Sequence, residues 1–242
     1  MCNKPEDLNL NGVDIIAIDL ETYDPNLKSK GTGAIRQDGF ITGVAVCTKN
    51  ETVYFPLQHS DTQKTEEEKK DFWDKFLEKV LLNKKITKVF HNAMYDVCWI
   101  RAVTGKMIEG RIVDTMIAAS VIDENRFRYS LDSLAKDYLK ESKYKYDLQQ
   151  KTLEWSGGTV KDPMTNMHKL PATLVKDYAK QDVNLTFKLW KKFNKKLDEV
   201  LYINEDGESK TCRKIFELET KLFLCLVEMK FKGVRIDVLK LK

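Results

Sequence analysis

The chain has 242 residues, of which 42% are hydrophobic and 32% are charged, and its formal net charge is +4 at pH 7. Its length corresponds to one or two domains, and a charge this small does not demand a polyanionic partner. Every apolar run is shorter than the roughly 18 residues that a membrane-spanning helix needs, and the N-terminus lacks the apolar core of a signal peptide. We therefore expect no membrane partner and a cytoplasmic location, or a host cytoplasm for a viral protein.

Hydrophobic patterning predicts strands first and then strands interleaved with helices. In chain order it predicts a strand at 13–22, a loop at 24–39, a hairpin at 40–48 and 51–57, a helix at 65–82 and a strand at 86–92. It then predicts helices at 93–104, 115–122, 130–140, 171–201 and 212–232, with a brief strand at 111–114 and a polar region at 141–170. This alternation is typical of a mixed sheet flanked by helices, the α/β class.

Histidine and cysteine do not suggest a metal site. The five cysteines are widely spaced and include no Cys-x-x-Cys pair, which excludes a disulfide framework or a zinc cluster. His59 and His168 stand in predicted loops without partners at ligand spacing, so we expect them at the surface. His91 is expected to be a structural residue at a strand end.

Two carboxylates stand two residues apart near the end of the first predicted strand. Asp19 and Glu21 therefore point to the same face of that strand. Adjacent carboxylates repel each other and resist desolvation unless a cation neutralises them, and hard oxygen ligands favour Mg²⁺ or Mn²⁺. The motif is weak evidence alone, because Asp206 and Glu208 repeat it in a turn that we expect to be solvated.

Two further acidic motifs lie on predicted helices. Asn92 and Asp96 follow a strand, where Asn92 could equally be a helix cap and Asp96 a charge that favours the helix dipole. Tyr178 and Asp182 lie four residues apart on the long helix, so their side chains share one face. Each motif has an ordinary structural explanation, and the informative observation is that all of them occur together and in this order.

With these motifs in place, the chain resembles the DnaQ-like 3′–5′ exonucleases of the DEDD superfamily. The residues that match the family's motifs are Asp19, Glu21, Asp96, Tyr178 and Asp182. Tyr178 is typical of the tyrosine-containing branch, which holds the proofreading domains of family A DNA polymerases and the RNase D and Werner-type exonucleases. The resemblance implies a ribonuclease H-like mixed β-sheet flanked by α-helices.

The resemblance also implies a two-metal hydrolysis with two Mg²⁺ ions, for which Mn²⁺ would substitute. The ligands it implies are Asp19, Glu21, Asp96 and Asp182. Tyr178 would orient the attacking water, because a phenol with a pKa of about 10 is a poor base at neutral pH. Substrate contacts are expected at Leu20, Thr22, Asn92, Tyr95, Phe127 and Tyr129. For Phe127 and Tyr129 the alternative is that their rings pack against a helix start.

The function implied is removal of nucleotides from the 3′ end of DNA, preferably single-stranded, in a proofreading or replication role. One alternative is an RNase D-like 3′–5′ RNA exonuclease, although such chains usually carry a further helical domain. The other alternative is a non-catalytic module that binds nucleic acid or a polymerase. The presence of all four carboxylates and the tyrosine argues against a non-catalytic module.

Residues 1–201 are expected to form the exonuclease domain, and residues 202–242 a helical extension. The segment 212–237 resembles the start of a family A polymerase domain, although we expect no palm, fingers or thumb in this chain. The apolar run 223–227 exceeds what an exposed helix tolerates. We therefore expect this segment to pack on the core, or to dock a separate DNA polymerase subunit or a second copy.

Overall fold

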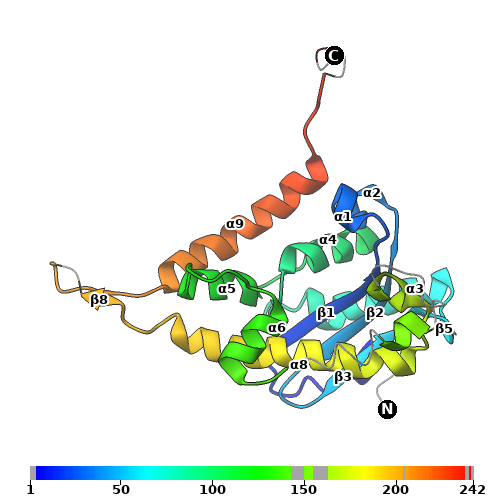
Figure 1. Cartoon of the computed structure of the whole chain (residues 1–242), viewed down its shortest axis with the longest axis horizontal. Helices are drawn as coiled ribbons and strands as arrows, with labels where there is room; N and C mark the ends of the chain where they lie inside the picture. Colours follow the sequence, from blue (N-terminus) through cyan, green and yellow to red (C-terminus); the bar gives the residue numbers. More distant parts are fainter. Residues whose placement is uncertain (1–3, 143–149, 155–162, 204, 238–239, 241–242) are drawn as a thin grey trace.

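A computed structural model of the chain describes residues 4–142, 150–154, 163–203, 205–237 and 240. Its centre is a five-stranded sheet in the order β3-β2-β1-β6-β7 (Figure 1). The strands are β1 (Ile15–Tyr23), β2 (Phe40–Cys47), β3 (Thr52–Pro56), β6 (Thr87–Phe90) and β7 (Ile112–Asp114). β1, β2 and β3 are antiparallel neighbours, whereas β6 is parallel to both β1 and β7. The predicted α/β class with a mixed sheet is confirmed.

Helices cover both faces of this sheet. One face packs against α3 (Glu66–Phe76), the π-helical segment η2 (Leu77–Leu81) and α4 (Ala93–Thr104). The other face packs against α5 (Thr115–Ile122), α6 (Leu131–Leu134), the π-helical segment η3 (Ala135–Leu139) and α8 (Ala172–Lys196). Ile16, Ile18 and Leu20 of β1 belong to the first core, and Ala17 belongs to the second. Because successive side chains of a strand point to opposite faces, Asp19 and Glu21 lie on the α8 side.

The remaining elements are short, except for the last helix. They are η1 (Pro5–Asp7), α1 (Leu27–Lys30), α2 (Gly33–Arg36), β4 (Gln58–His59), β5 (Thr62–Gln63), η4 (Pro163–Lys169), β8 (Tyr202–Ile203), β9 (Ser209–Lys210) and α9 (Arg213–Lys232). Residues 150–154 are also helical. Two predictions were wrong in detail, because the expected loop at 24–39 contains α1 and α2, and the long helix ends at Lys196 instead of 201.

Long-range contacts explain where α8 ends. Arg213, the first residue of α9, donates a hydrogen bond to the Asn194 carbonyl at 2.5 Å and pairs with the Asp198 carboxylate at 2.7 Å. A cation beside the final carbonyl groups favours termination of a helix at that point. The chain then enters the β8–β9 hairpin, where the Leu201 N–H donates to the Lys210 carbonyl at 2.8 Å. The sequence pattern of α8 itself could not predict this end point, because Arg213 lies outside the helix.

The last helix, α9, packs on the core along one face only. Phe216, Phe223 and Val227 are buried, with exposed fractions of 0%, 4% and 0%. Arg101 of α4 holds the same helix through a bidentate pair with Glu228, at 2.5 and 3.0 Å. The opposite face exposes Ile215, Leu218, Leu222, Leu226 and Met229. The expectation that the apolar tail packs on the core is therefore correct for one face of the helix.

No helix among the described residues has the length and apolar character that crossing a bilayer requires.

Candidate active site

The first two acids lie where β1 leaves the regular sheet. Glu21 pairs with Gly43 of β2, and Thr22 pairs with Ile41, so Thr42 is the extra residue of a β-bulge. Bulges bend a strand and redirect its side chains, and they are frequent beside active sites. Glu21 is buried, with an exposed fraction of 7%, and Asp19 is half-buried.

Asp96 approaches these two acids from the first turn of α4. Its Oδ1 accepts a hydrogen bond from the Leu20 N–H at 3.1 Å, which ties the turn to the backbone between Asp19 and Glu21. Burial, and after it the charge of Asp19, raises the pKa of Asp96 well above its usual range. The predicted first and second motifs therefore meet in space, across 76 residues of sequence.

Tyr178 and Asp182 come to the same place from α8, on the face that covers β1. Asp182 is buried, with an exposed fraction of 5%. Burial, followed by the charges of Asp182, Glu21 and Asp19, raises the pKa of Tyr178 far above that of a free phenol. The phenol is therefore protonated at neutral pH and can donate a hydrogen bond. The structure thus brings together all five residues that the motifs singled out.

Asp114, not Asn92, caps the helix that carries Asp96. The Asn92 side chain makes no capping hydrogen bond, and its backbone has φ of 65°, a left-handed conformation that asparagine tolerates. The Asp114 carboxylate accepts hydrogen bonds from the backbone N–H groups of Asn92 at 3.0 Å and Ala93 at 2.8 Å. It also accepts one from the Met116 N–H at 2.8 Å, so a single acid caps both α4 and α5. Sequence patterns did not predict that Asp114 caps α4, because they identify only capping side chains that stand next to a helix in the sequence.

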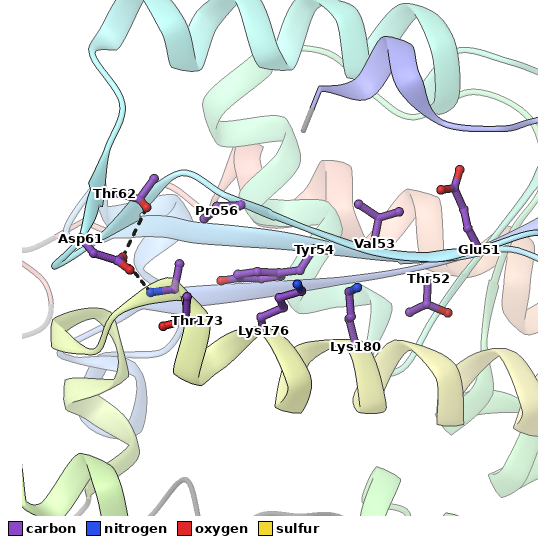
Figure 2. A pocket seen from close by; sticks show the side chains of 11 residues that line it. Glu51, Thr52, Val53, Tyr54, Pro56, Asp61, Thr62, Thr173, Lys176 and Lys180 are labelled. Atoms are coloured by element: carbon purple, nitrogen blue, oxygen red, sulfur yellow. Dashed lines mark hydrogen bonds between the residues drawn. The ribbon is translucent and has the colours of Figure 1, made fainter. Parts of the chain in front are cut away.

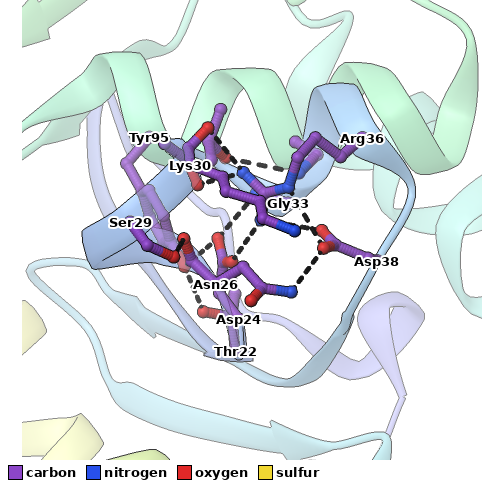
Figure 3. A network of polar contacts seen from close by, with 12 residues as sticks. Thr22, Asp24, Asn26, Ser29, Lys30, Gly33, Arg36, Asp38 and Tyr95 are labelled. Carbon is purple, nitrogen blue, oxygen red and sulfur yellow. Dashed lines mark hydrogen bonds and ion pairs between the residues drawn. The ribbon is translucent and has the colours of Figure 1, made fainter.

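Two of the expected substrate contacts, Thr22 and Tyr95, touch each other beside the acids. The Tyr95 hydroxyl lies 2.5 Å from Thr22 Oγ1 and donates to Asp24 Oδ2 at 3.4 Å. Burial raises the pKa of Tyr95 to about 12, so this hydroxyl is protonated at neutral pH. Figure 3 shows that the contact belongs to a larger polar network in the segment after β1.

Arg36 holds that network together. Its guanidinium pairs with Asp24 at 3.2 Å and with Asp38 at 2.7 Å, while Asp24 Oδ2 accepts from the Gly33 N–H at 2.7 Å. The guanidinium also donates to the carbonyl of Lys30 at 2.9 Å (Figure 3). These contacts turn the expected loop into two short helical turns that support Thr22 and Tyr95.

The other proposed substrate contacts differ in their surroundings. Leu20 is buried, and its backbone N–H is already bonded to Asp96. Phe127 is fully exposed, whereas the half-buried Tyr129 donates its hydroxyl to the Asp123 carbonyl at 2.8 Å. Tyr129 is therefore packed against its surroundings, as the alternative expected, whereas Phe127 is not. Substrate contact by either residue stays a prediction.

Of the two histidines that were expected at the surface, His59 is buried and His168 is half-buried, so that prediction was wrong for His59 and only partly right for His168. His59 is 1% exposed, and its Nε2 lies 2.7 Å from the Tyr54 hydroxyl. His168 packs against Tyr23 with a centroid distance of 4.1 Å and is half-buried. His59 lies in β4, just after the edge strand β3. The sequence placed it in an exposed loop, but η4 packs against this segment.

A pocket of about 360 Å³ opens between β3 and α8 (Figure 2). Tyr54 forms part of its wall, and Lys176 and Lys180 of α8 point towards the strand. Asp61, at one end, accepts a hydrogen bond from the Ala172 N–H at 2.8 Å and so caps α8. None of the four clustered acids lines this pocket, which therefore lies apart from the acidic cluster.

The acidic cluster fits a hard divalent cation in its chemistry. All its potential ligand atoms are carboxylate oxygens, and a cation would offset the burial and the charge of Asp19, which together raise the pKa of Asp96. Within the described ranges, no group of three or more acidic, histidine or cysteine side chains is arranged so that it could hold a metal ion.

Relatives of the chain include phage DNA polymerases. DNA polymerase DpoZ of Acinetobacter phage SH-Ab 15497 is 34% identical over 151 residues, which are 62% of this chain and 22% of that protein. A DNA-directed DNA polymerase of Pseudomonas phage M6 is 28% identical over 239 residues, which are 93% of this chain and 32% of that protein. The chain thus spans about a fifth to a third of the length of these relatives.

Solved structures with a similar fold include NrnC of Brucella melitensis and RNase D of Trypanosoma brucei. Brucella melitensis NrnC with bound Mg²⁺ has a TM-score of 0.62 and 19% identity, covering 98% of this chain and 94% of that one. Trypanosoma brucei RNase D in complex with RNA U12 has a TM-score of 0.60 and 20% identity, covering 94% of this chain and 66% of that one. At these identities the likeness concerns the fold, and it agrees with the expected ribonuclease H-like sheet.

A family model described as 3′–5′ exonuclease matches residues 1–198, a span that contains all five clustered residues. The chain therefore belongs to the 3′–5′ exonuclease family that is found in family A DNA polymerases.

Proposed function

We propose that this protein hydrolyses DNA from the 3′ end, preferably single-stranded, and releases 5′-nucleotides in a proofreading or replication role. The observation that carries the proposal is the meeting of four carboxylates and one phenol from β1, α4 and α8. The elements that supply them are far apart in sequence, and the family match spans all of them. The polymerase relatives favour DNA as the substrate over RNA.

In this proposal each clustered residue has one role. Asp19, Glu21, Asp96 and Asp182 provide the oxygen ligands for two Mg²⁺ ions, with Mn²⁺ as a substitute. The chemistry that bound divalent cations supply is activation of water and stabilisation of the departing 3′-oxygen. Tyr178 donates a hydrogen bond that orients the attacking water, a role that its protonated state permits. Thr22 and Tyr95, tied together by their hydroxyls, form one wall for the terminal nucleotide.

The test is degradation of 3′- and 5′-labelled single-stranded DNA and matched RNA, with Mg²⁺ and then with EDTA. We expect metal-dependent shortening of DNA from its 3′ end, faster than that of RNA. Asp19→Ala is expected to abolish cleavage, while Asp206→Ala, in the exposed turn that repeats the Asp-x-Glu motif, keeps full activity. Full activity of Asp19→Ala would overturn the mechanism, and preference for RNA would move the protein to the RNase D type.

We further propose that residues 1–201 carry the nuclease chemistry and that the extension 202–242 faces a DNA polymerase. The exposed apolar side chains of α9 provide the docking surface, and the relatives that match this chain are polymerases. Leu218→Lys is expected to weaken association with the polymerase portion of the Acinetobacter phage relative by roughly tenfold, which is typical of losing one apolar anchor of an interface. Unchanged association in a pull-down titration would remove this role from α9.

A further inference from the structure

Two hollows adjoin each other beside α8, away from the acidic cluster. One, of about 390 Å³, lies between the helix and the turn that joins β2 to β3, and the other, of about 660 Å³, lies beside the C-terminal half of the helix. Lys188 and Lys191 line both hollows, which therefore form one groove. The groove also meets the pocket of Figure 2, because Glu51 and Thr52 line both that pocket and the first hollow.

Lysine supplies most of the charge in this lysine groove. The lysines that line it are Lys49, Lys188, Lys191, Lys192, Lys195 and Lys196. The acids among the described residues of its lining are Glu51 and Glu199. Glu51 Oε1 accepts from the Asn9 N–H at 2.6 Å, and Glu199 pairs with Lys196 at 3.6 Å. The groove therefore has an excess of positive charge, although the formal net charge of the whole chain is only +4.

The charge of the groove comes from two elements that are far apart in the sequence. Lys188, Lys191 and Lys195 share the exposed face of α8, because residues three and four apart lie on one side of a helix. Such a row alone is the ordinary solvated face of an amphipathic helix. Here Lys49, in the turn between β2 and β3, lines the same hollow as two of these lysines. A concave surface lined by charges of one sign concentrates the electric field and attracts ligands of the opposite charge.

Several of these ammonium groups are available to an incoming anion. Within the part of the chain that the structure describes, Lys49, Lys191 and Lys195 have no carboxylate partner. Lys188 pairs with Glu141 at 2.9 Å, and both side chains of this pair are partly open to solvent. Solvent-exposed ion pairs of this kind contribute little to stability, so a phosphate group can replace the carboxylate.

The aromatic side chains in the lining are not open to stacking. Trp190 is 2% exposed and Phe187 is 7% exposed. The Lys191 ammonium lies over the Phe187 ring, 4.5 Å from its centre. Grooves that hold the bases of a single strand present open aromatic rings, whereas contacts to phosphate need only charge and carry no sequence information. The groove therefore fits a sugar–phosphate backbone of any base sequence.

We propose that the lysine groove binds the sugar–phosphate backbone of the DNA substrate beyond the 3′ end that is cleaved. Asp182 and Lys188 stand six residues apart on α8, roughly 9 Å along the helix axis, so one DNA molecule can reach both the acids and the groove. None of the five clustered residues lines the groove, which therefore binds DNA without taking part in the cleavage step. The inference rests on the proposed function, because that function identifies the polyanion as DNA.

Binding without cleavage tests the groove directly. The probe is a fluorescent single-stranded DNA of about 20 nucleotides in EDTA, titrated by fluorescence anisotropy at several salt concentrations. Replacing Lys49, Lys191 and Lys195 together by glutamine removes three positive charges from exposed positions. For single strands the slope of log K against log salt concentration is about −0.7 per neutralised phosphate, so the slope should become less steep by roughly 2. At a salt concentration of about 0.1 M the affinity should fall on the order of 10- to 100-fold.

A matched variant controls for the change in net charge. Lys70, Lys85 and Lys106 are also exposed, and they line neither hollow. Their joint replacement by glutamine removes the same charge and should leave the slope within about 0.5 of the wild-type value.

Cleavage kinetics add a second readout. The groove variant should keep the wild-type rate on thymidine 5′-(4-nitrophenyl phosphate), because a mononucleotide ester at the acids does not extend to the groove. Its Michaelis constant for the long oligonucleotide should rise, while the turnover number stays at the wild-type value.

The outcomes distinguish this inference from the proposed function. An unchanged salt slope in the groove variant would overturn the inference, even if the wild type cleaves DNA as proposed. An equal change in the matched variant would also overturn it, because the effect would then follow net charge alone. A wild type that cleaves no nucleic acid, and whose DNA binding weakens only in the groove variant, would refute the proposed function and support the groove as a DNA-binding surface.

Discussion

Replacing Phe223 by alanine is expected to weaken the packing of α9 on the core and to destabilise the fold. Phe223 is 4% exposed and belongs to the core on the α3–α4 face of the sheet. Truncation of a buried phenylalanine costs about 3–5 kcal/mol, because transfer free energy is lost and a cavity remains. Alanine is also the better helix former, so α9 itself is not weakened by the change. The loss therefore measures the docking of the helix.

The corresponding change in melting temperature is large enough to measure directly. A chain of this size loses about 2–4 °C for each kcal/mol, so Phe223→Ala should melt roughly 6–20 °C below wild type. Leu218→Ala is the matched control, because Leu218 lies on the same helix with 64% of its surface exposed. Exposed substitutions of this kind stay within about 0.5 kcal/mol. Thermal unfolding followed by circular dichroism compares the two.

An unchanged melting temperature in Phe223→Ala would refute the reasoning, since it would mean that α9 contributes nothing to the fold in solution. The same result would favour a structural boundary near residue 201. Under the packing described here, a chain cut at 201 would lose the burial of Phe216, Phe223 and Val227 together. At about 1.5–3 kcal/mol each, that loss is comparable to the 5–15 kcal/mol that stabilises a typical domain.

Two further predictions concern buried charges outside the acidic cluster. The two carboxylate oxygens of Asp114 accept hydrogen bonds from three backbone N–H groups, and Asp114→Asn replaces one of these oxygens. The free energy of unfolding, measured with denaturant, should fall by about 2–3 kcal/mol. Cleavage should also fall, because the first turn of α4 becomes less firmly held. Wild-type stability in that variant would show that the caps are dispensable. Burial lowers the pKa of Lys88 to about 8, whereas a lysine in the unfolded chain has a pKa of roughly 10.4. Between these two pH values the unfolded state holds one more proton than the folded state, so the free energy of unfolding should increase as the pH rises. We expect a rise of roughly 1–2 kcal/mol, less than the full pKa difference would give because the Asn83 and Glu109 carbonyls accept from the ammonium. The rise should be absent in Lys88→Met, and an equal rise in that variant would assign it to other groups.

Local sequence signals predicted most of the fold. The Thr65–Glu68 capping box is formed as expected, with the Thr65 N–H 2.7 Å from Glu68 Oε2, because both partners lie within one turn. The α4 and α5 helices have the predicted bounds for the same reason. The motifs also predicted the five residues that meet at the candidate site, since their spacing within each element already puts them on common faces.

What sequence patterning missed depends on partners distant in the chain. Asp114 caps a helix that begins 21 residues before it, and Arg213 bonds to Asn194, in the last turn of a helix, 19 residues before it. His59 is buried because η4 and the start of α8, more than 100 residues later, cover its strand. Single-sequence patterns report local geometry, and these features arise from tertiary pairing.

The partners of two buried acids indicate which one is available to a cation. Asp24 has the Arg36 guanidinium at 3.2 Å, so its charge is cancelled within the fold and it serves to hold the segment after β1. Asp96 instead accepts from the neutral Leu20 N–H, and the charges that act on it most strongly are those of Asp19 and Asp114. The neutral donor does not cancel the negative charge of the ionised carboxylate, so burial and the neighbouring charges raise the pKa of Asp96, and a cation that binds there favours the ionised form. Asp24, which follows β1, therefore has a structural role because its partner is an arginine. Asp96, which follows the neighbouring strand β6, is the candidate ligand because its partner is a backbone N–H.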